Sequence, residues 1–430
     1  MIRTSVLVGC VPFVLAARIA TWAGDARLEA VTAPLDALVP ELVTLYEELH
    51  RNPELSDHEA WTAETLAGRL RAIGFEVTTG VGGTGVVGVL RNGAGPTVLL
   101  RTDLDALPVE EKTGVPYASR AAGRMHACGH DLHMTAWIGT ATLLARARER
   151  WHGTIVAIGQ PAEEIGTGAR AMLRDGLYER FPKPDFAVAV HTSADHPAGR
   201  VAYTSGWALA SVDSVDLTIY GKGGHGAYPH RTIDPIVIAA RTVVALQTLV
   251  ARENNPLDPA VVTVGSFHAG TKHNIIPDDA RLQLTVRSYT PEVRKRLLAG
   301  IERIARAEAA AAGAPREPEM KVDEGTPSTY NDPQLTARLV AAVRGAIGAD
   351  NVVEQPAVMG GEDFSEFGRA GVPAAILWVG AVDPALYAAA QVSGTPLPSL
   401  HSPIFAPDAR RAIPTAVRAE TAALLALLSP

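Results

Sequence analysis

The chain has 430 residues, of which 47% are hydrophobic and 20% charged, and its formal net charge is −7. This length exceeds the ~250–300 residues at which single cores stop growing, so we expect more than one domain in a globular protein. Nucleic-acid-binding proteins need a basic face, so the acidic balance excludes nucleic acid as an expected partner. Two cysteines, Cys10 and Cys128, are too few for a disulfide framework.

The first residues have the pattern of an export signal. One positive charge precedes an apolar run over 5–17, and small residues in 21–26 offer a cleavage site. We therefore expect residues 1–26 to be a signal peptide and the protein to be exported, to the periplasm or beyond. The alternatives are an ordinary N-terminal helix, with the protein in the cytoplasm, or a mis-assigned start. No later run reaches the ~18 apolar residues of a membrane span, so no stable span is expected.

Helical and strand-like patterns alternate over the first half of the chain. Apolar residues at helical spacing predict helices over 34–51, 59–73 and 130–148. Short apolar runs predict strands over 75–79, 86–91, 97–101, 154–159 and 186–191. This alternation predicts an α/β fold class, with strands covered by helices.

The pattern changes near residue 210 and changes back near residue 331. Strands at 214–220, 260–267 and 280–289 and helices at 235–252 and 291–312 suit a small antiparallel sheet with two helices on one face. A helix to residue 347, a strand at 374–379 and a helix from 407 then resume the alternation. We expect an α/β domain in two segments, 34–208 and 322–430, and an inserted α+β, ferredoxin-like domain at 209–321.

The first candidate site motif is RTDLD, residues 101–105, directly after an apolar strand. Open α/β sheets bind ligands outside the carboxyl ends of their strands, which is where Asp103 and Asp105 would project. A carboxylate there can orient a metal-binding histidine. An aspartate at this place could equally cap a helix or a turn.

The second motif, MHACGHDLH over 125–133, gathers three histidines, one cysteine and one aspartate. Thiolate, imidazole and carboxylate are the side chains that hold transition metals. Gly129 permits a tight turn, so Cys128 and His130 could face the same pair of ions. The alternative is a buried free cysteine beside a polar turn.

The remaining candidates are two acids and two histidines. Glu163 and Glu164 follow an apolar strand, so one could bind metal while its neighbour activates water; paired glutamates are otherwise a solvated surface. His191 ends a strand-like run and His401 lies in a predicted loop. Each could be structural alone, but together with the other motifs they supply enough ligands for two metal ions.

Six motifs in this order, RTDLDALP, MHACGHDLH, QPAEE, GKGGHGAYPH, HNIIPD and GGEDF, resemble the M20 metallopeptidase clan. They are most similar to its amidohydrolase branch of hippurate hydrolases, N-acyl-L-amino acid amidohydrolases and auxin-conjugate hydrolases. The resemblance runs from about Pro34 to the C-terminus. It implies a zinc-peptidase-like mixed sheet, an inserted dimerisation domain, a homodimer, and hydrolysis of linear amides in small N-acyl amino acids with two divalent metal ions per subunit.

The resemblance also implies the metal ligands. These would be Cys128, which would bridge the two ions, His130, Glu164, His191 and His401. A thiolate with imidazoles favours zinc, while manganese, cobalt or nickel are alternatives because geometry and supply also decide occupancy.

Further roles are implied by the same resemblance. Glu163 would be the general base and Asp103 its helper, orienting a ligand. His225 would stabilise the oxyanion from the partner subunit of a dimer, and Asn274 and Arg287 would hold the substrate carboxylate. Glu362 and Asp363 match a family motif without an assigned role.

Three rival functions are left open by the sequence. One is a dipeptidase or carboxypeptidase of the same clan, and a second is a metal-binding protein without activity, which would need no general base such as Glu163. A third is a nucleophilic serine or cysteine hydrolase, although the chain has no G-x-S-x-G elbow.

Overall fold

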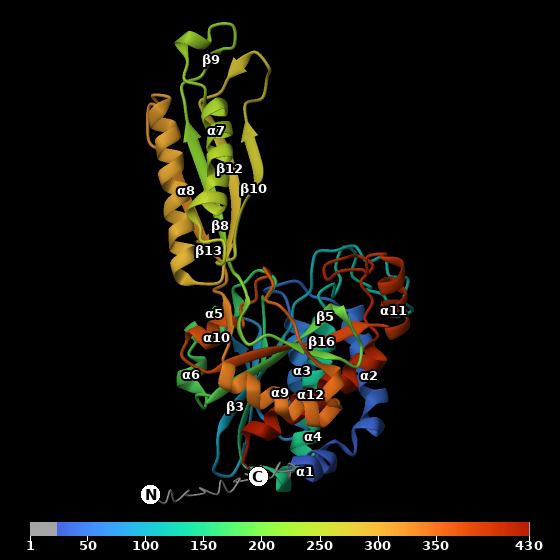
Figure 1. The fold of residues 1–430 in the computed structure, drawn as a ribbon. Coiled ribbons are helices and arrows are strands. Elements are labelled where there is room, and N and C mark those ends of the chain that lie inside the picture. Colours follow the sequence, from blue (N-terminus) through green and yellow to red (C-terminus); the bar gives the residue numbers. More distant parts are fainter. Residues whose placement is uncertain (1–23, 430) are drawn as a thin grey trace, which may run out of the picture.

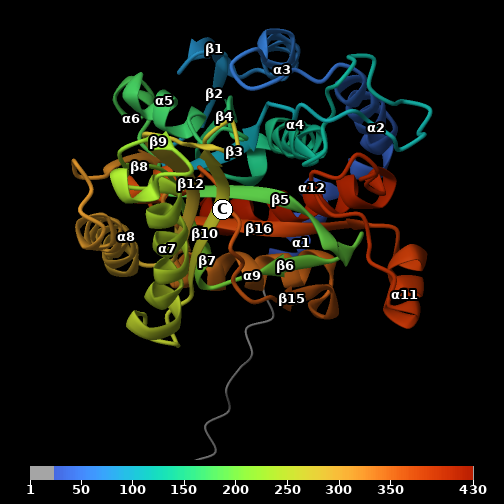
Figure 2. The ribbon, with the colours of Figure 1, turned by 90° about the horizontal axis from the view of Figure 1, so that it is seen from above.

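The computed structural model describes residues 24–429, so nearly all of the expected leader lies outside the described residues. The chain forms a body and an arm that projects from it (Figure 1). We call residues 24–210 and 325–429 the body and residues 211–324 the arm. Seen from above, the arm stands over one end of the body, and helix α11 (Pro384–Ser393) lies at the opposite end (Figure 2).

The body is built on an eight-stranded sheet in the order β1-β2-β4-β3-β5-β16-β6-β15. The strands are Glu76–Val81 (β1), Gly85–Asn92 (β2), Thr97–Asp103 (β3), Gly153–Gln160 (β4), Phe186–Pro197 (β5), Val201–Tyr203 (β6), Val352–Glu354 (β15) and Ala374–Val382 (β16). The central strands β4, β3, β5 and β16 are mutually parallel, whereas β1, β2 and β6 join antiparallel neighbours. Every residue of β16 is buried, as expected for a parallel strand covered on both faces.

Helices cover both faces of this sheet. The helices of the body are Gly24–Thr32 (α1), Leu35–Arg51 (α2), Ala60–Ala72 (α3), His130–Arg146 (α4), Gly168–Arg174 (α5), Leu177–Arg180 (α6), Pro333–Ile347 (α9), Ser365–Arg369 (α10), α11 and Ala409–Leu427 (α12). Helices α2, α3, α4, α9 and α12 share one large core with the sheet, and α5, α6 and α10 pack on a second. A small pair, β7 (Gly206–Leu209) and β14 (Thr329–Asn331), lies at the junction with the arm.

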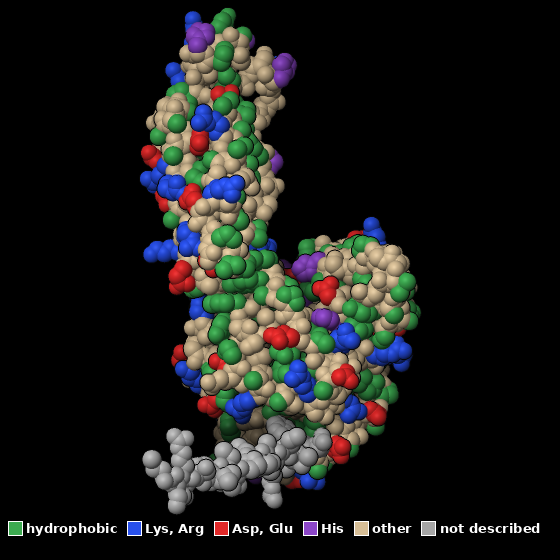
Figure 3. Space-filling model, viewed as in Figure 1, with side chains coloured by type: hydrophobic (Ala, Val, Ile, Leu, Met, Phe, Trp, Pro, Cys, Tyr) green, Lys and Arg blue, Asp and Glu red, His purple; other side chains and the backbone are tan. Residues whose placement is uncertain are grey.

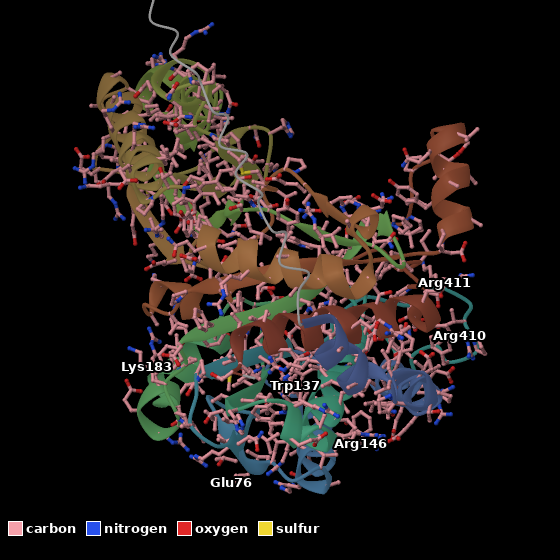
Figure 4. The ribbon with its side chains drawn as sticks, turned by 60° about the horizontal axis from the view of Figure 1, so that its bottom comes forward. Glu76, Trp137, Arg146, Lys183, Arg410 and Arg411 are labelled. Carbon is pink, nitrogen blue, oxygen red and sulfur yellow. The ribbon has the colours of Figure 1, made fainter. Side chains whose placement is uncertain are left out.

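Helix α4 occupies the centre of the body and carries the second motif at its start. Trp137 lies among packed side chains, whereas Glu76 and Lys183 lie at the periphery (Figure 4). The Trp137 indole N–H donates to the Leu100 carbonyl of β3 at 3.1 Å, so the buried polar atom is satisfied. Because almost every side chain of α4 is buried, the position of its first turn is fixed by packing on all sides.

The arm is a four-stranded antiparallel sheet with two helices. Its strands are Ser211–Tyr220 (β8), Ala260–Ala269 (β10), Asp279–Ser288 (β12) and Glu319–Glu324 (β13), in the order β10-β12-β8-β13. Helices Pro235–Thr248 (α7) and Pro291–Ala311 (α8) pack with this sheet around one apolar core. The chain order β-α-β-β-α-β and this spatial order define the ferredoxin-like, split βαβ arrangement. At the tip, Gly224–His225 (β9) pairs with Ile275–Ile276 (β11).

Side chains expected from capping rules begin five of these helices. Each cap accepts a hydrogen bond from a backbone N–H in the first turn: Asp234 for α7, Thr290 for α8, Asp332 for α9, Asp383 for α11 and Asp408 for α12. Proline occupies the first turn of α7, α8 and α9, where its missing N–H costs no intrahelical bond.

One stretch of the described chain, Pro235–Glu253, is long and apolar enough to cross a membrane by length and composition. It consists of α7 and a following wider turn, and Ile238, Ala239 and Leu246 on one side belong to the core of the arm. Packing within the arm therefore accounts for its apolar character on that side.

The α/β class with a mixed sheet is confirmed, and the long helices begin and end within a few residues of their expected bounds. One detail was wrong: His191 does not end its strand, because β5 continues to Pro197 beside β16. The strands of the arm run from Ser211 to Glu324, and β13, β6 and β15 were not expected. The dimerisation role of the arm stays a prediction.

Candidate metal centre

The candidate ligands meet where β3, β4 and β5 face the first turn of α4. Gly129 makes this possible, with a left-handed φ of 82° directly before His130. A Cβ at Gly129 would lie 2.6 Å from the Thr192 hydroxyl oxygen, closer than real Cβ contacts. Glycine therefore permits both the turn and the close approach to β5, which brings Cys128 and His130 to the same side.

The structure brings all five predicted ligands and the predicted base together. Ligand atoms within 4.8 Å of one another form three overlapping groups: Cys128 with His130 and His191; Cys128 with Glu164 and His401; and His130 with Glu163 and Glu164. Cys128 belongs to two groups, as the bridging role that the resemblance implies would require. That role stays a prediction.

Individual distances leave room for ions between the ligand atoms. The Cys128 Sγ lies 3.6 Å from the His191 Nε2, and the His401 Nε2 lies 3.5 Å from the Glu164 Oε2. The His130 Nε2 is 3.8 Å from a carboxylate oxygen of both Glu163 and Glu164. Two ligand atoms that each bind one zinc at 2.0–2.3 Å lie about 3–4 Å apart, so these separations fit shared ions.

Buried polar atoms without a hydrogen-bond partner also indicate a cation site. The His130 Nε2 and the Glu164 Oε1 are buried and have no hydrogen-bond partner among the described residues. The His130 Nδ1 donates to the Asp105 carbonyl at 2.8 Å and the His191 Nδ1 to the Thr192 carbonyl at 2.7 Å, which leaves each Nε2 with a free lone pair. Buried acceptors without donors are costly, and a cation would satisfy them, so the residues fit bound metal.

Burial sets the protonation of these groups. It raises the pKa of the Cys128 thiol, with the Glu164 charge adding to the shift, and raises the pKa of Glu164 to about 7. Burial and then the imidazole of His133 lower the pKa of His191, which keeps that ring neutral and able to ligate. Burial also raises the pKa of Glu163, followed by the charge of Glu362. A proton acceptor with a raised pKa suits acid–base work near neutrality.

Two aspartates of the first motif hold the ligands in place. The Asp103 Oδ1 accepts from the His133 Nδ1 at 2.8 Å, and its Oδ2 lies 3.6 Å from the His130 Nε2. The Asp105 Oδ2 accepts from the Glu164 backbone N–H at 2.9 Å and from the Ser56 hydroxyl at 2.6 Å. Asp105 therefore contacts two predicted ligands, one through its carbonyl and one through its side chain.

His401 differs from the other ligands in exposure and backbone. Its side chain is 56% exposed, and its φ of 64° lies in the left-handed region, which non-glycine residues rarely adopt. Its backbone N–H donates to the Ala127 carbonyl at 2.8 Å, beside Cys128. Such strain persists only where the surroundings impose it, and it accumulates at functional sites.

A fully buried arginine lies beneath the base. Arg101 donates to Asp103 at 2.7 Å, to Glu362 at 2.8 Å and to the Gln160 side-chain oxygen at 3.0 Å. Gln160 in turn donates to Asp363 at 2.6 Å. The carboxylate oxygens of Glu163, Glu362 and Asp363 lie within 4.8 Å of one another, so the GGEDF motif adjoins the metal centre.

The residues predicted to contact substrate lie elsewhere in the same chain. His225 and Asn274 are together at the tip of the arm, where His225 pairs with Ile275. Arg287 lies near the other end of β12, and its Nη1 donates to the Met359 carbonyl at 2.7 Å. Ten residues of strand span about 30 Å, so Asn274 and Arg287 of one chain do not hold a single carboxylate together. The role of His225, expected from a partner subunit, stays a prediction.

The structure brings the predicted ligands together, and it adds supporting residues that the sequence analysis did not assign. His133 and Asp105 were within quoted motifs without a separate role, and Arg101 had none. The available signal was the alternation in RTDLD: Arg101 and Asp103 are two apart at the end of a strand and share a face, and Arg101 donates to Asp103 there.

A buried thiol, imidazoles and carboxylates at the carboxyl ends of parallel strands, with a second acid beside the ligand glutamate, define a metal-dependent hydrolase. The chain belongs to peptidase family M20/M25/M40, whose model matches residues 99–392, and it is a hydrolase of amide bonds. The resemblance drawn from the motifs is thereby confirmed.

Three similar proteins illustrate the range of the family. Thermostable carboxypeptidase 2 of Saccharolobus solfataricus is 39% identical over 330 residues, which cover 76% of this chain and 82% of that protein. N-acetyl-L-cysteine deacetylase of Bacillus subtilis is 37% identical over 338 residues, covering 77% and 79%. The structure of the Bacillus subtilis YxeP protein, described as a dinuclear metal binding peptidase, has a TM-score of 0.74 at 32% identity, covering 90% of this chain and 98% of that one.

Proposed function

We propose that the protein hydrolyses the amide bond of small N-acyl amino acids, with aromatic or aliphatic acyl groups, using two divalent metal ions. The observation that carries the proposal is the pair Glu163–Glu164. Both carboxylates lie beside His130, and Glu163 is buried and makes no ion pair shorter than 3.8 Å among the described residues. The similarity to a deacetylase of an N-acetyl amino acid supports this substrate class.

Cys128, His130, Glu164, His191 and His401 would hold the ions. When bound, such ions polarise a carbonyl and lower the pKa of a water. A thiolate with imidazoles favours zinc, with manganese, cobalt or nickel as alternatives.

Glu163 is proposed to act as general base and then as general acid. Its carboxylate lies at the edge of the ligand groups, 3.8 Å from the His130 Nε2, so it can reach a water placed among them. Burial raises its pKa, which helps it to take a proton from the attacking water and later deliver it to the leaving amine. General acid–base catalysis of this kind contributes about 10²- to 10⁴-fold in rate.

The arm is proposed to form the contact of a homodimer. Helix α7 exposes Ile236, Val237 and Val244, with 71% of Val244 accessible, opposite its buried side. Hydrophobic side chains lie along the arm, and histidines lie at its tip and beside the notch between arm and body (Figure 3). A second copy packed on this face would bury the apolar residues and would allow His225 of one chain to approach the metal centre of the other.

A second candidate is cleavage of short peptides from their carboxyl end. The similarity to a thermostable carboxypeptidase favours it, because the matched region covers as much of that relative as it does of the deacetylase.

We also propose that the N-terminal segment directs export of the protein.

The test is release of free amino acid from N-acetyl, N-benzoyl and indole-acetyl amino acids and from dipeptides. Each is measured with protein as purified, after chelation, and after return of zinc, manganese, cobalt or nickel. We expect chelator-sensitive release from N-acyl amino acids. Release from dipeptides alone would favour the second candidate, and no release from folded, metal-loaded protein would refute both.

A further inference from the structure

A short segment of the body, residues 358–363, joins the base of the arm to the metal centre. The chain passes into the arm at 209–212 and returns at 324–329. The Val358 N–H donates to the Ala208 carbonyl at 3.0 Å, and the Ala210 N–H donates to the Gly360 carbonyl at 2.9 Å. We call these two passages, 209–212 and 324–329, the hinge. The two bonds and the Arg287 contact to Met359 at 2.7 Å attach the start of the segment to the hinge and to the base of the arm.

Gly361, in the middle of the segment, packs so closely against Val212 and Thr326 that there is no room for a side chain. A Cβ at Gly361 would lie 2.5 Å from the Val212 Cγ2 and 2.9 Å from the Thr326 hydroxyl oxygen. The two passages are themselves bonded, because the Val212 N–H donates to the Thr326 carbonyl at 2.9 Å. A change in the angle of the arm that moves Val212 or Thr326 towards this segment would therefore displace Gly361. At Gly360, by contrast, a Cβ would meet only the Leu209 Cδ2, at an ordinary 3.5 Å.

The segment ends on two buried acids beside the base. The Glu362 carboxylate is held by Arg101 at 2.8 and 3.4 Å and accepts the Phe364 N–H at 2.9 Å. Asp363 accepts the Ala169 N–H at 3.0 Å. Because the backbone of Glu362 directly follows Gly361, the hinge and the Arg101 pair cannot move independently.

The charges around Arg101 indicate how its pairing with Glu362 affects Glu163, the proposed base. Arg101 is buried among the carboxylates of Asp103, Glu362, Asp363 and Glu163, and it binds the first three directly. A buried guanidinium seeks a bidentate carboxylate, and Glu362 supplies one. The Glu163 carboxylate lies within 4.8 Å of that of Glu362, so if Glu362 were neutral or displaced, Arg101 would pair with Glu163 and draw its carboxylate away from the ligand groups.

We propose that Glu362 is a positioning residue that keeps Arg101 off Glu163, and that residues 359–362 make this arrangement depend on the position of the arm. The proposal rests on the proposed function, because it assigns Glu163 as the base. Closure or rotation of the arm would thus change the turnover of a metal centre whose ligands do not move.

The first test compares Gly361→Ala with Gly360→Ala, neither of which touches a ligand. We expect Gly361→Ala to lower kcat at least tenfold, with KM and metal content within twofold of the wild type, and Gly360→Ala to leave all three unchanged. Wild-type kcat in Gly361→Ala, or equal losses in the two variants, would overturn the proposal.

The second test uses Glu362→Gln and its matched control Glu366→Gln. Glu366 is also buried and paired with an arginine, Arg170, at 2.8 Å, but makes no contact with Arg101. We expect Glu362→Gln to lower kcat while binding metal normally, and Glu366→Gln to lower only the melting temperature. A fall in kcat in the control alone, or in both variants equally, would refute the positioning role. If Gly361→Ala fails to fold, the comparison of Glu362→Gln with Glu366→Gln tests the positioning role of Glu362 by itself.

A readout without substrate separates this proposal from the proposed function. In metal-free protein, the amide hydrogens of Ala169 and Phe364 report on the bonds to Asp363 and Glu362. We expect Gly361→Ala to speed their exchange at least tenfold, while Gly360→Ala does not. Unchanged exchange would refute the coupling. Faster exchange in a protein without N-acyl activity would retain the coupling and reject the substrate class.

Discussion

Glu420 of α12 provides a quantitative test for a protonated acid in the core of the body. One carboxyl oxygen accepts from the Thr140 hydroxyl of α4 at 2.6 Å, and the other has no partner among the described residues. Burial raises the pKa of Glu420 to about 8. In the unfolded chain the same group titrates near its ordinary value of about 4.3, so between these limits the native state binds a proton that the unfolded state has lost.

The sign and size of the effect follow directly. Stability due to this group is fully present below about pH 4.3 and is lost as the pH rises towards 8, at about 1.4 kcal/mol per pH unit. Between pH 6 and 8 the loss is therefore about 2–3 kcal/mol. Glu420→Gln does not titrate, keeps an acceptor for Thr140, and should gain that much on the wild type over this interval.

Urea unfolding of metal-free wild type and Glu420→Gln at pH 6, 7 and 8 measures the difference in the free energy of unfolding. Taking the difference removes the contribution of the acids at the metal centre, which both proteins share. A difference that does not change with pH would refute a protonated Glu420 in the native core. Thr140→Val in the Glu420→Gln background controls for the lost hydrogen bond.

Three further predictions concern the metal centre. Glu163→Gln should keep its metal content and lose at least 10²-fold in kcat, measured as amino acid release beside metal analysis; near-normal turnover would remove Glu163 as the base. Cys128→Ala should lower the metal content per subunit, and unchanged content would argue against the bridge. Asp105→Asn should weaken metal binding 10–100-fold, as competition with a chromophoric chelator would show, because the Asp105 carboxylate accepts from the Glu164 backbone N–H and lies 3.3 Å from the His130 Nδ1; wild-type affinity would contradict that role.

The sequence was sufficient for the fold class and for the residues that gather at the metal centre. Apolar runs such as 97–101 and 186–191 indicate buried strands, and motifs that follow such runs must meet at one edge of the sheet. That the candidate ligands lie together was predictable because thiol, imidazole and carboxylate side chains carry the metal-binding chemistry themselves. A cysteine and a histidine separated by a single glycine, as in Cys128-Gly129-His130, are typical of a metal site.

The supporting network was not predictable in the same way. Arg101 and Glu362 are 261 positions apart, and nothing in either segment alone shows that they pair. The extra strands β6 and β15 have only three residues each, too few for a periodic pattern. Asn274 and Arg287 lie near opposite ends of the arm, a separation that local sequence does not give, and their role in holding the substrate carboxylate stays a prediction.

The exposure of His401 has a consequence for how ions enter and leave. Three of the other predicted ligands lie on β5, at the start of α4 or two residues before it, and Glu164 is held through Asp105. His401, by contrast, belongs to a loop, and its side chain is more than half accessible. We therefore expect the group of Cys128, Glu164 and His401 to open to solvent more readily than that of Cys128, His130 and His191. Two bound ions would then exchange with solvent at different rates, and the ion held by Cys128, Glu164 and His401 would exchange faster.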